Sequence, residues 1–125
     1  MAPGHSPGFL ALVNDARQHV REFSIEEYRE RLARGERWIL VDVREDGEWE
    51  KSRIPGAVHL SKGVIERDVE ERFPDKSEPL VLQCGGGFRS VLVAENLQKM
   101  GYTNVVSLDG GIRGWRDRGL PVEES

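Results

Sequence analysis

Cysteine is almost absent from this chain of 125 residues, in which Cys84 is the one example. A single cysteine excludes a disulfide within the chain, and a free thiol is typical of a reducing compartment such as the cytoplasm. Histidine is also scarce, and its three positions (His5, His19 and His59) are scattered. Because a structural metal site needs about four clustered ligands, we expect no metal site and no bound cofactor.

Long apolar runs and an excess of positive charge are missing as well. No run approaches the roughly 20 residues that cross a bilayer. The opening segment, MAPGHSPGFLALV, has neither the basic start nor the apolar length of a signal peptide. The formal net charge is -4, and no basic stripe accompanies it. We therefore expect neither a membrane nor nucleic acid among the partners.

The length and composition that remain fit one globular domain. Hydrophobic residues make up 38% of the chain and charged residues 32%, which is ordinary for such a domain. We expect a lead with a short helix in residues 1–23, a domain in 24–122 and an exposed tail in 123–125. Within the first segment, residues 1–8 read as disordered, and apolar spacing in 9–23 predicts an amphipathic helix.

Short apolar runs alternate with helical patterns along the rest of the chain. Runs of this kind are typical of strands buried on both faces of a parallel sheet, and they occur at 38–42, 57–60, 80–84 and 104–108. Helices are expected at 46–51, 63–73, 90–100 and 111–118. Another helix should begin after Ser24, which forms a capping-box pattern with Glu27, and end at Gly35. This alternation predicts an α/β fold.

The cysteine stands at the end of one expected strand, in the stretch CGGGFRS (84–90). Ligands of open parallel sheets bind outside the carboxyl ends of the strands. The three glycines permit the backbone angles with which successive N–H groups form an anion-binding nest. The next helix points its positive end at the same place, Arg89 adds a cation, and Ser90 is a candidate N-cap. Together these features predict a reactive, accessible thiolate at Cys84.

A purely structural interpretation of the stretch stays open. A lone cysteine is often a small core residue, the glycines fit a plain turn, and Arg89 fits a solvated surface charge. The combination favours function, because three flexible glycines add an entropic cost that an inert connection does not need. Four residues separate Cys84 from Arg89, one fewer than in the loops of cysteine phosphatases. Such a ring is tight for a phosphate but has room for one extra sulfur atom on the cysteine.

Four segments of the sequence resemble the rhodanese family in its single-domain sulfurtransferase form. In chain order they are LVDVRE (40–45), RIPGAVHL (53–60), CGGGFRS (84–90) and LDGGIRGWRDRGLPV (108–122). The resemblance implies a rhodanese-like three-layer fold with a five-stranded, mostly parallel sheet flanked by helices. The chain departs from the family pattern at Ser52 and Arg53, where Gly-His is common, and at Gly85, where a charged or polar residue is common.

The resemblance also implies an activity, that of a thiosulfate sulfurtransferase. The catalytic residue would be Cys84, which would accept sulfane sulfur as a persulfide. The partners implied are a small anionic sulfur donor, thiosulfate or another persulfide donor, and a thiophilic acceptor: cyanide, a thiol or a partner protein. The residues implied to bind the donor are Gly85, Gly86, Gly87, Phe88, Arg89 and Ser90. A separate general base is not needed if the nucleophile is already a thiolate.

Other functions compete with this one. A regulatory binding module that uses the fold only as a scaffold would be expected to lack the cysteine. A thiol redox sensor usually needs a resolving cysteine, which only a partner could supply here. A cysteine phosphatase or arsenate reductase is disfavoured by the length of the loop.

Several polar and aromatic residues outside the loop have simpler structural interpretations. We expect Asp42 and Arg44 to fix the loop after the first strand through a local ion pair or turn hydrogen bonds, rather than to orient the site. Trp49 and Trp115 are expected to be core anchors. His59 fits a partly buried, hydrogen-bonded histidine better than a base.

Overall fold

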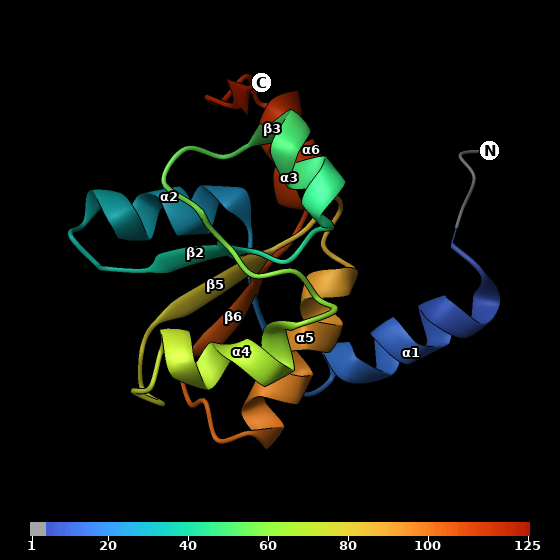
Figure 1. The fold of residues 1–125 in the computed structure, drawn as a ribbon. Helices are drawn as coiled ribbons and strands as arrows, with labels where there is room; N and C mark the ends of the chain where they lie inside the picture. Colours follow the sequence, from blue (N-terminus) through green and yellow to red (C-terminus); the bar gives the residue numbers. More distant parts are fainter. Residues whose placement is uncertain (1–4) are drawn as a thin grey trace.

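The computed structural model of the protein describes residues 5–125 as three layers, with helices on both faces of one sheet (Figure 1). The strands of this sheet are β1 (Arg21–Phe23), β2 (Ile39–Asp42), β4 (Val58–His59), β5 (Leu80–Gln83) and β6 (Val105–Leu108). Their order is β1-β6-β5-β2-β4, and every neighbouring pair is parallel. The predicted α/β architecture with a five-stranded parallel sheet is confirmed.

Each face of the sheet carries its own apolar cluster, because successive side chains of a strand point to opposite faces. On β5, Leu80 and Leu82 belong to one cluster and Val81 to the other. The first face is covered by α1 (Pro7–Arg17), α4 (Ile65–Arg72) and α5 (Arg89–Lys99), as Figure 1 shows. The second is covered by α2 (Ile25–Ala33) and α6 (Gly111–Asp117). The carboxyl end of β5 is therefore flanked by helices on both sides.

The expected helices agree with the structure within a few residues. Helix α3 (Asp46–Lys51) has the predicted bounds, and α4, α5 and α6 differ from theirs by one or two residues at an end. The predicted cap of α2 is also present, because the Ser24 hydroxyl accepts a hydrogen bond from the backbone N–H of Glu27 at 3.0 Å. Gly35 follows the helix with φ of 91°, the left-handed conformation expected at this position.

The helix predicted over residues 9–23 is wrong at its C-terminal end. Helix α1 ends at Arg17, and Arg21–Phe23 forms the edge strand β1 beside β6. Val20 and Phe23 are both buried, so the apolar pattern of the helix continues through them in the sequence. In the structure they belong to apolar clusters on opposite faces of the sheet. Part of the disordered lead predicted for residues 1–8 falls outside the described residues, and α1 already begins at Pro7. The division of the chain into 1–23, 24–122 and 123–125 stays a prediction.

A second, two-stranded sheet was not predicted. It pairs β3 (Ser52–Arg53) with β7 (Glu123–Glu124) in antiparallel fashion. The side chains of β7 are exposed, as expected for the tail. The pairing of β7 with β3 holds the C-terminus beside α3 (Figure 1). None of the helices in residues 5–125 has the length and apolar character needed to cross a membrane.

The ion pair expected of Asp42 and Arg44 is present and buried. The Arg44 guanidinium donates to both carboxylate oxygens of Asp42, at 2.8 to 3.1 Å, and to the carbonyl of Ser52 at 2.6 Å. The Asp42 carboxylate also accepts the backbone N–H of Arg44. The pair therefore fixes the turn after β2 to the start of β3.

The two tryptophans expected to be core anchors differ in their surroundings. Trp115 is buried, as predicted, and its indole N–H donates to the carbonyl of Pro121 at 2.7 Å. Trp49 is only half-buried and stacks on His59, with ring centroids 4.8 Å apart and planes within 6°. The His59 ring also lies 2.9 Å from the carbonyl of Arg44, which fits the predicted hydrogen-bonded histidine.

Candidate active site

Cys84 directly follows β5, at the carboxyl edge of the sheet, as the apolar run predicted. Its side chain is buried, with 1% of the residue's surface exposed, so the prediction of an openly accessible thiol is wrong. The backbone N–H of Gly87 donates a hydrogen bond to the sulfur atom, with 3.1 Å between nitrogen and Sγ. One of the predicted loop amides is thus directed at the sulfur. A donor of this kind stabilises negative charge on a thiolate.

Helix α6 holds the loop from its second side. The N–H of Ile112 donates to the carbonyl of Cys84 at 2.9 Å, and the N–H of Arg113 donates to the carbonyl of Gly85 at 3.0 Å. Gly111 permits this contact: its φ is 52°, and a methyl group there would overlap the carbonyl oxygen of Cys84. Two loop carbonyls, which would repel an anion, are thereby occupied by donors of α6.

A cavity of about 510 Å³ is lined in part by Cys84. Aromatic side chains form part of its wall. The ring centroid of Phe88 lies 4.4 Å from that of His5 and 6.3 Å from that of Phe9. Two of these residues, His5 and Phe9, come from the N-terminal segment. The complete lining is His5, Ser6, Phe9, Cys84, Gly86, Phe88, Arg89 and Arg113. Because Cys84 is otherwise buried, this cavity is its path of approach.

Arg89 lies in the cavity wall but is already paired. Its two terminal nitrogens donate to the two carboxylate oxygens of Glu48, at 2.7 and 3.1 Å. These hydrogen bonds raise the pKa of Arg89 and lower the pKa of Glu48. The nearby Cys84 sulfur also raises the pKa of Arg89. Glu48 in turn accepts the backbone N–H of Glu45 at the start of α3. The pair therefore ties α3 to the first residue of α5.

Ser90 does not cap α5, contrary to the prediction. The helix begins at Arg89, with Phe88 in the capping position, so Ser90 lies inside the first turn. Its hydroxyl is buried, 3.6 Å from the Cys84 sulfur and 2.7 Å from the hydroxyl of Ser107 on β6. Ser90 thus connects the sulfur to the core of the sheet.

The predicted donor-binding residues divide into two groups. Gly86, Phe88 and Arg89 share the cavity with Cys84. The others lie outside its lining: Gly85 offers its carbonyl to α6, Gly87 its N–H to the sulfur, and Ser90 its hydroxyl within the core. Their roles in binding a donor stay predictions.

Four residues near the cysteine loop were missed from the sequence: Glu48, Arg113, His5 and Phe9. A signal existed for Arg113. Because β5 and β6 are adjacent and parallel, the segments after them must meet at one edge of the sheet. The segment LDGGIR after β6 therefore lies beside CGGGFR after β5. No local pattern connects Glu48 or the N-terminal segment with the cysteine.

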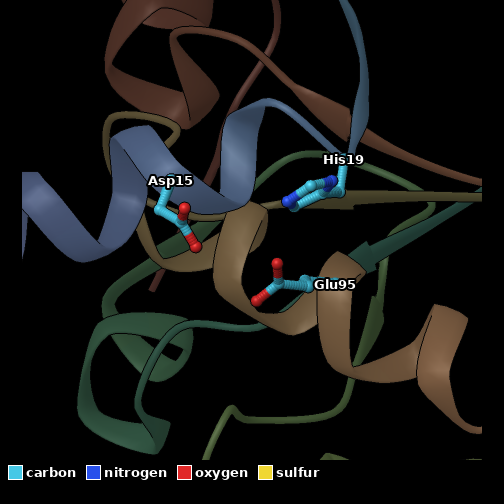
Figure 2. A group of neighbouring side chains, drawn as sticks. All are labelled: Asp15, His19 and Glu95. Carbon is cyan, nitrogen blue, oxygen red and sulfur yellow. The ribbon is translucent and has the colours of Figure 1, made fainter.

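One group of potential metal ligands occurs among the described residues, away from the cavity lining. Ligand atoms of Asp15, His19 and Glu95 lie within 4.8 Å of one another at the junction of α1 and α5 (Figure 2). Asp15 and His19 are exposed, and Glu95 also lies 3.9 Å from Lys99. None of these three residues lines the cavity beside Cys84. The expectation that the protein has no metal site stays a prediction.

Comparison with known proteins agrees with this architecture. A sulfurtransferase of Allochromatium vinosum is 35% identical over 82% of this chain and 94% of its own length. The thiosulfate sulfurtransferase GlpE of Actinobacillus succinogenes is 35% identical over 68% of this chain and 75% of its own. The chain also matches the Bacillus subtilis protein YrkF, of which it spans 51%.

A solved structure from Rhodopseudomonas palustris superimposes over nearly the whole chain. It belongs to a protein of unknown function described as a possible tyrosine phosphatase. The two are 27% identical, with a TM-score of 0.83, over 98% of this chain and 99% of that one. The family model of the rhodanese-like domain matches residues 24–118, which include the cysteine loop and all of α6. The chain therefore belongs to the rhodanese-like domain family of sulfurtransferases.

Proposed function

We propose that the protein transfers sulfane sulfur through a persulfide on Cys84, from a small anionic donor such as thiosulfate to a thiophilic acceptor. The observation that carries this proposal is the N–H of Gly87, which donates to the Cys84 sulfur at 3.1 Å, and Cys84 also shares a cavity with Arg89 and Arg113. The site thus combines a nucleophile with groups that favour anions.

In the first half of the reaction, the Cys84 thiolate attacks the outer sulfur of thiosulfate. A bond forms between the two sulfur atoms, the sulfur–sulfur bond of the donor breaks, and sulfite leaves with the bonding electrons. Sulfite carries away negative charge, which the cationic groups of the cavity stabilise as it develops. The remaining charge lies on the outer sulfur of the persulfide.

In the second half, the acceptor attacks that outer sulfur. Cyanide leaves as thiocyanate, or a thiol leaves as a new persulfide, and the Cys84 thiolate is restored. No redox partner is consumed and no general base is needed, because the nucleophile begins and ends as a thiolate. The cycle needs Cys84 as a free thiol, so we propose a reducing compartment such as the cytoplasm as its location.

Steady-state kinetics with thiosulfate and cyanide test the proposal. We expect thiocyanate to form with double-displacement kinetics, that is, parallel lines in double-reciprocal plots, and we expect Cys84→Ser to be inactive. Intersecting lines, or thiocyanate formation that persists in Cys84→Ser, would count against a persulfide intermediate.

Hydrolysis of an aryl phosphate tests the second candidate, a phosphatase. This candidate is favoured by the description of the Rhodopseudomonas palustris relative. It is disfavoured by the loop, in which four residues separate Cys84 from Arg89, one fewer than in the loops of cysteine phosphatases. We expect no hydrolysis. Robust hydrolysis that depends on Cys84, without sulfur transfer, would assign the protein to the phosphatases instead.

A further inference from the structure

We propose that Arg113 of α6 holds the anionic end of the sulfur donor, and that Glu48 keeps Arg89 from doing so. This inference rests on the proposed sulfur transfer and names the residue that selects the donor. It differs from the expectation drawn from the sequence, in which the arginine of the cysteine loop binds the donor.

The charge of Arg89 is balanced before any donor arrives. Both of its terminal nitrogens are engaged by Glu48, and Glu48 is held in place by the backbone N–H of Glu45. A donor that took over Arg89 would have to break a two-pronged, charge-assisted contact. It would also approach a carboxylate of its own sign. Arg89 therefore acts as a positioning residue that fixes the start of α5, where the loop ends.

The charge of Arg113 is free by comparison. No hydrogen bond or ion pair of its guanidinium occurs within residues 5–125, although the side chain lines the cavity. The guanidinium lies over the loop glycines: a methyl group built on Gly86 would be 3.1 Å from Nη1, and one on Gly85 3.8 Å from Nη2. An arginine that lines the same cavity as the nucleophile and has no charged partner within residues 5–125 is suited to bind an oxyanion through two N–H groups.

The backbone fixes Arg113 relative to the sulfur. Its own N–H donates to the carbonyl of Gly85, and the N–H of Ile112 donates to that of Cys84. The backbone of Arg113 is thus held beside the cysteine loop by these two hydrogen bonds. A donor in the cavity can direct its sulfonate oxygens at Arg113 while its outer sulfur faces Cys84, so the same arginine stabilises the sulfite that leaves.

Four variants test this assignment in steady-state turnover of thiosulfate and cyanide. In Arg113→Ala, we expect the KM for thiosulfate to rise on the order of tenfold or more, because a charge-assisted contact is lost. The dependence on cyanide should not change. Arg113→Lys should be intermediate, since the charge remains without the fork. Glu48→Gln should release Arg89 and, in the Arg113→Ala background, recover part of the loss. Recovery of this kind would not occur if Arg113 were merely structural.

A binding measurement removes the dependence on turnover. Cys84→Ser should bind thiosulfate in calorimetry, and Cys84→Ser/Arg113→Ala should bind it at least about tenfold more weakly. Arg116→Ala is the matched control, because Arg116 is on the same helix but pairs with Glu124. It should leave both the KM and the affinity unchanged.

The outcomes separate the two proposals. If the wild type turns over thiosulfate but Arg113→Ala and Arg113→Lys keep its KM, while Arg89→Ala raises it, then Arg89 is the donor contact and the inference is wrong. If the wild type forms neither thiocyanate nor a sulfur adduct, the proposed function fails and the inference fails with it.

Discussion

The backbone N–H of Gly87 points at the sulfur of Cys84, three residues earlier, with 3.1 Å between the two atoms. This contact depends on a glycine, because Gly87 has φ of 96°, a conformation that other residues rarely adopt. A methyl group there would also lie 2.9 Å from the backbone nitrogen of Gly110. The loop can therefore direct an N–H group at the sulfur only while position 87 has no side chain.

The first prediction concerns this position. Gly87→Ala should lower the free energy of unfolding by about 1–3 kcal/mol, because the backbone is strained or shifts. It should also reduce persulfide formation, since the N–H turns away from the sulfur. Chemical denaturation and adduct formation measure the two effects. Gly47→Ala is the control, because Gly47 lies in α3 with no atom near its added methyl group, and it should be neutral or stabilising. If Gly87→Ala and Gly47→Ala had the same stability and formed the persulfide equally well, position 87 would not need a glycine.

The buried ion pair gives the second prediction. Arg44→Met leaves the carboxylate of Asp42, which is 0% exposed, without its partner. We expect a loss of about 3–5 kcal/mol in the free energy of unfolding, the usual cost of an unpaired buried charge. The double variant Arg44→Met/Asp42→Asn should be more stable than Arg44→Met alone.

An exposed pair supplies the comparison for that prediction. At the surface, Nε of Arg67 lies 2.7 Å from Oδ1 of Asp68. Because a surface ion pair contributes little to stability, Arg67→Ala should leave the denaturation midpoint essentially unchanged. A small effect of Arg44→Met, similar to that of Arg67→Ala, would show that the turn after β2 does not depend on the buried pair.

The third prediction concerns acid. Arg89 lowers the pKa of Glu48 below the ordinary glutamate value of 4.5, so the unfolded chain takes up this proton at a higher pH than the folded chain. The pair's contribution to stability is therefore complete above that ordinary value and is lost as the pH falls through the lowered one. The stability difference between the wild type and Glu48→Gln should shrink on acidification.

Denaturation curves of both proteins, at neutral pH and at several values below 4.5, measure this difference. The other carboxylates are common to the two proteins and cancel in the comparison. Arginine stays protonated throughout, so Arg89 adds no pH dependence of its own. A difference that stayed constant into acid would mean that the pair does not stabilise the fold.

Much of the fold could be predicted because its signals are local. The apolar runs of β2, β5 and β6 gave those strands to within one residue, and the Ser24 cap placed the start of α2. The contact between Asp42 and Arg44 could be predicted for the same reason, because the two residues are only two positions apart. The resemblance to the rhodanese family supplied the five-stranded sheet.

The missed features depend on contacts between distant segments. β1 has three residues, too few for a periodic pattern, and it is a strand only because β6 lies beside it. The pairing of β3 with β7 likewise needs the two segments to be brought together. In the site, Glu48 and Arg89 are 41 residues apart in sequence. The sequence contains both residues but nothing that reveals their contact, which changes the role expected of the arginine.

Intact-mass spectrometry after brief treatment with thiosulfate detects the proposed persulfide on Cys84 itself. We expect the wild type to gain the mass of one sulfur atom and Cys84→Ser to gain none, and we expect cyanide to remove the added sulfur and release thiocyanate. A wild-type protein that gains no sulfur from thiosulfate, or an adduct that forms equally in Cys84→Ser, would contradict a persulfide on Cys84.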